Sequence, residues 1–268
     1  MQIGLTILLF IIGTCFGSFL CCQARRLHLK GKKGSKKLGS RSVCLHCGYQ
    51  LKWYDNIPIL SWLFLRGKCR KCHRKIGYAE IFSELGMGLT FLALGTTVNF
   101  NSATPLAWVI FACTLVLMLP LGFLAIYDGI YGELPVKYLY ISIVISAVIM
   151  ILKIITSLTA APLSVTTILD PLGSAAVLGG LYFVLYQVSK GKWVGDGDWL
   201  LGLALGFALS STWLALITLF IANLLACLIM APITIRNKHK KIYFGPFLVI
   251  AFVITLTFSE FFYYAVGG

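Results

Sequence analysis

The sequence KWVGDGDWL, Lys192 to Leu200, places two carboxylates, Asp196 and Asp198, between glycines. It leads directly into an almost uninterrupted apolar run from Trp199 to Met230. A helix of about 20 apolar residues is long enough to cross a bilayer. Because a charge at the mouth of a membrane segment costs free energy, an acidic pair at this point is a candidate functional site.

The composition extends this picture to the whole chain. Of its 268 residues, 59% are hydrophobic and 12% are charged, and the mean hydropathy is +0.88. One soluble core cannot hide so much apolar surface, so we expect an all-α, polytopic membrane protein. The run of residues 199–230 is too long for one upright crossing of about 20 residues, and we expect it to divide near residues 210–212. Eight transmembrane helices are then predicted, at residues 3–22, 80–98, 105–126, 136–156, 171–188, both halves of 199–230, and 244–265.

The distribution of positive charge sets the orientation of these helices. The net charge is +14, and most Lys and Arg residues lie between Arg25 and Lys75, whereas the predicted outer loops 99–104 and 157–170 contain none. Cytoplasmic loops are enriched in Lys and Arg, so segments 23–79, 127–136, 189–198 and 231–243 are predicted to be cytosolic. The first segment has no basic residues before it, which indicates a retained helix rather than a cleaved signal. We expect lipid headgroups, and not nucleic acid, to be the anions near the basic segment.

Two acids from distant parts of the chain are predicted to share one membrane face. Asp128 stands at the inner end of the third predicted helix, and Asp198 begins the sixth. Paired aspartates suit amide hydrolysis, because two close carboxyls share one proton, so that one activates water while the other polarises the carbonyl. Either residue alone could simply cap a helix. Asp196 is an alternative to Asp198, and Glu133 is a weaker rival that fits a solvated loop.

Four of the nine cysteines form two CxxC pairs in the basic segment. The spacing CxxC, 21 residues, CxxC is close to that of four-thiolate zinc sites. Four ligands leave no open position, so we expect a structural zinc site that contributes folding energy to a loop with little core. His46 and His73 are alternative ligands, although solvated positions suit them better. The predicted ligands are Cys44, Cys47, Cys69 and Cys72.

Other charged residues receive structural interpretations. Glu80 and Glu84 begin the second helix, where acids interact favourably with the helix dipole. Asp170 before Pro171 is expected to cap a helix N-terminus. Lys153 is expected to extend its amine towards the outer interface. The second hypothesis is a non-enzymatic transport or assembly protein that uses the edge carboxylates for proton or ion handling. A transporter is expected to place acids near the middle of the bilayer, and the centres of the predicted helices otherwise carry almost no charge, so this hypothesis ranks second.

Several motifs together resemble the type IV prepilin peptidase family, the prepilin leader peptidase/N-methyltransferases. They are Gly17-Ser18-Phe19-Leu20, the CxxC pairs around YDNIPILSW, RGKCRKCH with Ile76-Gly77 and Glu84, Asp128 before Pro135, Gly195-x-Gly197-Asp198, and Phe244-Gly245-Pro246-Phe247. The sequence departs from the family pattern at Val136, where an acid is usual, and at Leu200, where a lysine is usual.

The resemblance implies a GxGD-type aspartic endopeptidase of the bacterial inner membrane. It implies that Asp128 and Asp198 are catalytic, that the active site faces the cytoplasm, and that type IV pilin-like precursors are the substrates. It implies three parts: a first transmembrane helix at 1–22, a cytosolic zinc-binding domain at 23–79 and a membrane catalytic domain at 80–268. It also implies methylation of the new N-terminus with S-adenosylmethionine. No glycine-rich strand-to-helix fingerprint supports the methyl donor, which therefore rests on the resemblance alone.

Overall fold

The computed structural model describes residues 2–30, 42–44, 46–98, 103–160, 165–191, 194–236 and 243–264. Helices dominate these residues, and within them the extended pairing is limited to two isolated β-bridges, Val43 with Gln50 and Lys68 with Lys75. The predicted all-α fold is therefore confirmed. The chain forms two compact units, Met1–Gly95 and Thr96–Gly268.

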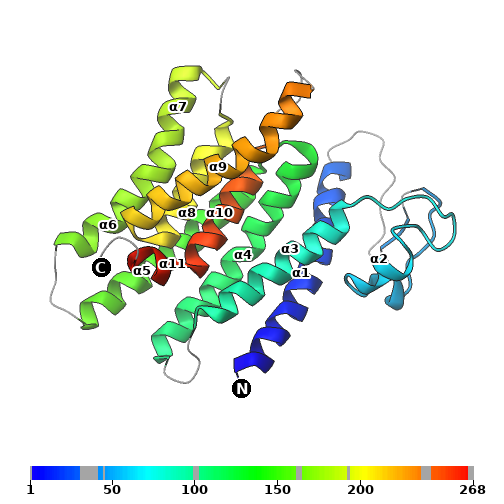
Figure 1. The fold of residues 1–268 in the computed structure, drawn as a ribbon, viewed down its shortest axis with the longest axis horizontal. Helices are drawn as coiled ribbons and strands as arrows, with labels where there is room; N and C mark the ends of the chain where they lie inside the picture. Colours follow the sequence, from blue (N-terminus) through cyan, green and yellow to red (C-terminus); the bar gives the residue numbers. More distant parts are fainter. Residues whose placement is uncertain are drawn as a thin grey trace. The chain divides into compact units, whose positions relative to one another are not determined.

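The first unit consists of two long helices and, between them in the sequence, a loop module whose described residues are 42–44 and 46–78 (Figure 1). Its elements are α1 (Gln2–Lys30), the 3₁₀ helix η1 (Trp53–Asn56), α2 (Leu60–Phe64) and α3 (Ala79–Thr96). The predicted first helix ended at Cys22, but α1 continues to Lys30, because the residues after the apolar run are still good helix formers. The division at residues 22 and 79 therefore remains a functional hypothesis.

Glycines bring α1 and α3 into backbone contact. A Cβ on Gly13 would lie 2.5 Å from the Met87 carbonyl oxygen, and a Cβ on Gly17 would overlap the Ser83 carbonyl oxygen. Small residues four apart allow helices to approach closely in membranes, where dispersion contacts replace the hydrophobic effect. The Gly13-x₃-Gly17 spacing thus explains how α1 packs against α3.

The two acids of α3 hold its neighbours in place: Glu84 contacts the loop module and Glu80 contacts α1. Glu84 is buried and accepts a hydrogen bond of 2.7 Å from the Ile59 N–H. Ile59 has a φ of 63°, which a β-branched residue rarely adopts, so the bond holds a strained turn. Glu80 forms an ion pair of 2.6 Å with Arg25 of α1. The acids of α3 therefore make specific contacts beyond the predicted interaction with the helix dipole.

The second unit contains the remaining helices (Figure 1). They are α4 (Pro105–Tyr131), α5 (Val136–Ala160), α6 (Val165–Ala175), the π-helical turn η2 (Ala176–Gly180), α7 (Leu181–Ser189), α8 (Asp196–Leu209), α9 (Thr212–Arg236), α10 (Gly245–Thr257) and α11 (Ser259–Tyr264). Asp170 lies inside α6 and does not begin it, so the predicted N-cap is wrong. The Thr212 hydroxyl donates instead to the Asp170 carboxylate, at 3.2 Å.

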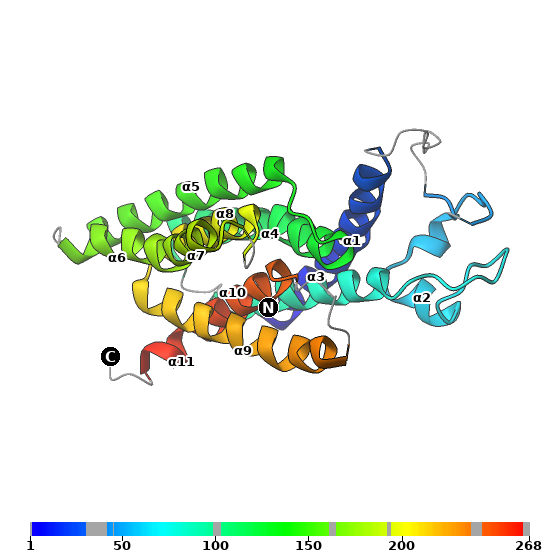
Figure 2. The ribbon, with the colours of Figure 1, turned by 90° about the horizontal axis from the view of Figure 1, so that it is seen from above.

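Helix α8 lies at the centre of this unit and packs against α5, α6, η2 and α10, while α9 runs beside α10 (Figure 2). The predicted division of the long apolar run is confirmed, since α8 ends before Ser210, which adopts φ 57°, and α9 begins at Thr212. Lys153 of α5 does not extend to the interface. Its Nζ donates to the carbonyl oxygens of Ala208 and Leu209, at 2.6 and 3.1 Å, and caps the end of α8.

In the part of the chain that the structure describes, five helical segments are long and apolar enough to cross a bilayer, so the chain is a multi-pass membrane protein. The other three predicted crossings coincide with α3, α8 and α10, which are helical but are shorter or less apolar. Eight crossings therefore remain a prediction. The five segments are Ile3–Leu29, Pro105–Tyr131, Val136–Thr159, Val165–Ser189 and Thr212–Met230.

Candidate active site and cysteine cluster

The first acid of the predicted pair, Asp128, lies in the last turn of α4. That helix ends at Gly132, which adopts φ 71° and donates its N–H to the Asp128 carbonyl oxygen. The Asp128 residue is only 5% exposed, and its Oδ2 accepts a hydrogen bond of 3.0 Å from the Gly245 N–H at the start of α10. A Cβ at Gly245 would lie 2.8 Å from this oxygen. Glycine therefore permits the close approach of the α10 backbone to the carboxylate.

The second acid, Asp198, lies in the first turn of α8. The helix begins at Asp196, two residues before the predicted cap, and Asp198 occupies its third position. Its Oδ2 accepts a hydrogen bond of 2.9 Å from the Gly195 N–H, as in the reciprocal half of a capping box. The residue is 8% exposed.

The fold brings Asp128 and Asp198 together, although seventy residues separate them in the sequence. They are close enough for the charge of Asp198 to act on Asp128. Leu134, in the loop after α4, packs against Gly197 near Asp198 and against Gly245 near Asp128. A Cβ added to Gly197 would lie 2.6 Å from the Leu134 side chain, and one added to Gly245 would lie 3.4 Å from it. The ends of α4, α8 and α10 thus converge on two buried carboxylates.

The rival acids do not join this pair. Asp196 is exposed, and its Oδ1 accepts a hydrogen bond of 3.2 Å from the Trp199 indole. Glu133 is exposed in the loop after α4, as predicted for a solvated acid. Within the described residues, each carboxylate of the pair accepts one hydrogen bond from a backbone N–H, and Oδ2 is the acceptor in both. The Oδ1 atoms of Asp128 and Asp198 are therefore available to water or substrate.

The four cysteines of the CxxC pairs meet in the loop module of the first unit. Their Sγ atoms lie within 4.8 Å of one another, with Cys44 to Cys72 at 3.9 Å and Cys47 to Cys69 at 4.0 Å. A tetrahedral zinc site with Zn–S bonds of about 2.3 Å has edges of about 3.8 Å. The cluster can hold a metal ion, and its donor set and size fit that geometry.

Local backbone structure prepares these thiols for metal binding. The two β-bridges close a tight loop around each CxxC pair. Hydrogen bonds from the backbone N–H groups of Cys72 and Lys71 outweigh burial and lower the pKa of Cys69 to about 7. His46 and His73 are exposed and do not belong to the cluster. The loops therefore present four cysteine sulfurs, and no imidazole, to a metal ion.

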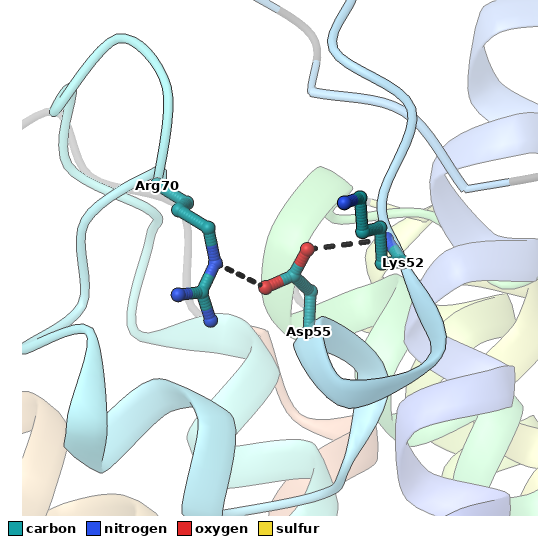
Figure 3. A network of polar contacts seen from close by, with 3 residues as sticks. All are labelled: Lys52, Asp55 and Arg70. Atoms are coloured by element: carbon teal, nitrogen blue, oxygen red, sulfur yellow. Dashed lines mark hydrogen bonds and ion pairs between the residues drawn. The ribbon is translucent and has the colours of Figure 1, made fainter.

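A buried carboxylate joins the two halves of the module, and the sequence analysis missed it. Figure 3 shows Asp55 between two donors: Oδ2 accepts from the Lys52 N–H at 3.1 Å, and Oδ1 accepts from Arg70 Nε at 2.7 Å. Arg70 lies inside the second CxxC pair and also stands over the Tyr54 ring, 4.9 Å from its centroid. The sequence offers one signal for this contact: Asp55 lies between aromatic and turn residues, and Arg70 lies within the second CxxC pair.

Comparison with known proteins places these features in a family. Residues 11–98 match the family model described as the Bacterial Peptidase A24 N-terminal domain. A protein of Aeromonas hydrophila named prepilin leader peptidase/N-methyltransferase is 30% identical over 232 residues, which cover 82% of this chain and 72% of that protein. Its counterpart in Dichelobacter nodosus is 29% identical over 221 residues, covering 81% and 71%.

A further relative matches over a shorter region. The Myxococcus xanthus protein of the same name is 42% identical over 87 residues, which are 32% of this chain and 25% of that protein. No solved structure is significantly similar to the chain.

A helical, multi-pass membrane protein with a buried pair of aspartates and a four-thiol cluster is the class that the fold and the sites define. Within that class, the chain belongs to the prepilin leader peptidase/N-methyltransferase family. It is therefore an enzyme, and the resemblance inferred from its motifs is confirmed.

Proposed function

We propose that the chain is an aspartic endopeptidase that removes the leader peptide from type IV pilin-like precursors, with Asp128 and Asp198 as its catalytic residues. The observation that carries the proposal is the meeting of these two carboxylates at the ends of α4 and α8. Both are buried, each is held by a single backbone N–H, and each keeps one oxygen available. The names of the relatives, prepilin leader peptidases, indicate the substrate class.

The pair suits peptide hydrolysis because the two carboxyl groups are close enough to interact electrostatically and both are buried. Like charges at such a site favour a state in which one proton is shared. The ionised carboxylate then removes a proton from water, and the protonated carboxyl donates to the carbonyl of the scissile bond. The Gly195 and Gly245 N–H groups hold the two carboxylates in place during this exchange.

The cysteine cluster is proposed as a structural zinc site. Cys44, Cys47, Cys69 and Cys72 would hold the ion with no position left for substrate, so that it supplies folding energy to the loop module. The proposal also includes methylation of the new N-terminus with S-adenosylmethionine, which rests on the names of the relatives, and no residue is assigned to the methyl donor.

The proposed location is the bacterial inner membrane, with the acid pair on the cytoplasmic side. The positive-inside rule supports this orientation, because Arg25 to Lys75 hold most of the positive charge. The leader would then be cut where the precursor's apolar segment leaves the bilayer, and the partners are the precursor and the lipid.

The test compares three isosteric variants of the purified full chain in lipid vesicles. With a pilin-like precursor as substrate and leader loss scored by mass, we expect Asp128→Asn and Asp198→Asn each to reduce cleavage by about 10³-fold or more. The control is Asp196→Asn, which removes an exposed acid two residues away and should cleave normally. Cleavage that persists in both Asp128→Asn and Asp198→Asn would reject the assignment and favour proton or ion handling by the edge acids.

A further inference from the structure

Tyr182, at the start of α7, carries a hydroxyl with no evident structural purpose. The residue is 4% exposed. Among the residues that the structure describes, none forms a hydrogen bond of ordinary length and angle with its hydroxyl. The Asn223 amide of α9 is nearby, but its Nδ2 already donates to the Leu219 carbonyl oxygen at 2.8 Å. A buried hydroxyl without a hydrogen-bond partner costs free energy, and a bound ligand that accepts a hydrogen bond from it would offset this cost.

A π-helical turn directs Tyr182 inwards. The turn η2 (Ala176–Gly180) immediately precedes α7 and adds a residue to one turn of the helix. Each residue turns an α-helix by about 100°, so the extra residue changes which side chains of α7 face the unit's interior. Leu181 and Phe183, on either side of Tyr182, are exposed, while Tyr182 is buried. Such turns occur frequently at functional sites.

Backbone contacts hold this turn against the helix that carries Asp198. A Cβ at Gly202 of α8 would lie 2.5 Å from the Leu178 carbonyl oxygen, and one at Gly179 would lie 3.0 Å from Leu203 Cα. The position of Tyr182 relative to Asp198 therefore depends on contacts between backbones and does not rely on flexible side chains.

Tyr182 has neighbours on the Asp198 side and on the Asp128 side of the acid pair. Its hydroxyl is close enough to feel the charge of Asp198. Its ring packs on Phe244, with the ring centroids 5.4 Å apart, and Phe244 directly precedes Gly245, whose N–H holds Asp128. The hydroxyl is thus a hydrogen-bond donor close to Asp198 and bonded to neither carboxylate, and its ring contacts the residue that precedes the Gly245 N–H donor to Asp128.

We propose that Tyr182 is a third catalytic group, whose hydroxyl donates a hydrogen bond to the carbonyl oxygen of the peptide bond that the acid pair cleaves. The inference rests on the proposed endopeptidase function and adds a residue that the sequence motifs do not contain. Preorganised donors aimed at the oxygen where negative charge develops are usually the largest single contribution to such catalysis.

The step balances with the groups present. The water oxygen bonds to the carbonyl carbon, its proton passes to the ionised aspartate, and the carbonyl electron pair moves onto the oxygen that Tyr182 contacts. The protonated aspartate then gives its proton to that oxygen. On collapse, the amide nitrogen takes a proton from the first aspartate, the C–N bond breaks, and a hydroxyl of the diol returns a proton to the second aspartate. Tyr182 keeps its own proton throughout.

The test is Tyr182→Phe in the full chain, which keeps the ring on Phe244 and removes the hydroxyl. We expect kcat for precursor cleavage to fall by about 10²-fold with KM changed less than about threefold, as for loss of one oxyanion donor. Affinity for a precursor peptide in which a hydroxyethylene unit replaces the scissile bond should fall at least about tenfold. The thermal unfolding midpoint should stay the same or rise, because a buried hydroxyl without a partner is removed. Tyr140→Phe, which removes an exposed hydroxyl from α5, is the matched control and should retain wild-type kinetics.

Two results would overturn the inference. One is a wild-type kcat in Tyr182→Phe; the other is a lower kcat accompanied by an equally lowered unfolding midpoint, as expected of a purely structural residue. The Asp128→Asn and Asp198→Asn variants separate the two proposals. If they are inactive while Tyr182→Phe is fully active, this inference alone fails, and if they remain active the endopeptidase proposal fails.

Discussion

The buried carboxylates of this chain differ in how completely they are held. Asp55 uses both oxygens, one for the Lys52 N–H and one for Arg70, so no oxygen is left for chemistry. Asp128 and Asp198 each receive one backbone N–H through Oδ2. A fully satisfied acid stabilises a fold, whereas a partly satisfied one can bind a ligand. The hydrogen bonds therefore distinguish Asp55, which is fully held, from the candidate catalytic pair.

The ion pair between Asp55 and Arg70 gives a prediction at the same scale. Arg70→Met leaves the buried Asp55 with a single backbone donor. Because nearly half of the Arg70 side chain is exposed and screened by solvent, we expect only a modest loss, on the order of fivefold weaker zinc retention. Zinc release to a chromogenic chelator measures it. Lys71→Met, which removes the adjacent exposed cation, should leave zinc retention unchanged, and equal loss in both variants would contradict the role given to Arg70.

At the scale of elements, α8 decides the geometry of the acid pair. Its N-terminus carries Asp198, its middle contacts η2 through Gly202, and Lys153 caps its C-terminal end. A displacement at the middle or the far end would therefore move the Asp198 carboxylate, which is proposed to be catalytic. Two predictions follow from the two contacts.

The first concerns the close contact of α8 with η2. In Gly202→Ala the new methyl group would collide with the Leu178 carbonyl oxygen, which is backbone and cannot rotate away. Overpacking of this kind costs about 1–3 kcal/mol, so we expect a lower unfolding midpoint and reduced cleavage. Gly180→Ala is the matched control, since no heavy atom lies within 4 Å of its added carbon, and it should behave as wild type.

The second concerns the helix end. Lys153→Met leaves the Ala208 and Leu209 carbonyl oxygens without their donor, at a cost of about 1–3 kcal/mol. Thermal unfolding in one detergent should show a midpoint lower by several degrees. Lys137→Met removes an exposed lysine from the same helix and should not change the midpoint. An unchanged midpoint in Lys153→Met would show that the cap adds no stability.

The elements were predictable to different degrees, for physical reasons. Apolar length and turn residues were sufficient to place the break near Ser210, because a membrane segment has a limited length. The pairing of Asp128 with Asp198 followed from topology and family motifs. The path of Lys153 and the inward face of Tyr182 were not predictable, since the first depends on a helix end 55 residues away and the second on a π turn without a sequence signal.

At the scale of the whole molecule, the cysteine cluster and the acid pair belong to different compact units. The cluster belongs to Met1–Gly95 and the acids to Thr96–Gly268, and each site is built from contacts within its own unit. Each unit should therefore have its own source of stability.

Metal removal tests this independence. A strong chelator should make the segment around Cys44 to Cys72 sensitive to protease, because a loop module with little core depends on the ion for folding. The helices α4 to α10 should stay resistant, and circular dichroism should retain most of its helical signal. Mass analysis of the fragments locates the cuts. Cleavage spread equally over both units would show that their stabilities are coupled.

The length of α8 has a consequence for how water reaches the proposed catalytic carboxylates. Its 14 residues rise about 21 Å, which is less than the roughly 30 Å thickness of a hydrocarbon layer. If the Ser210 turn sits at the outer boundary of that layer, Asp198, twelve residues earlier in the sequence, lies about 12 Å inside the inner boundary. The proposed endopeptidase would therefore hydrolyse its substrate below the lipid surface, and water would have to enter the headgroup layer above the start of this short helix.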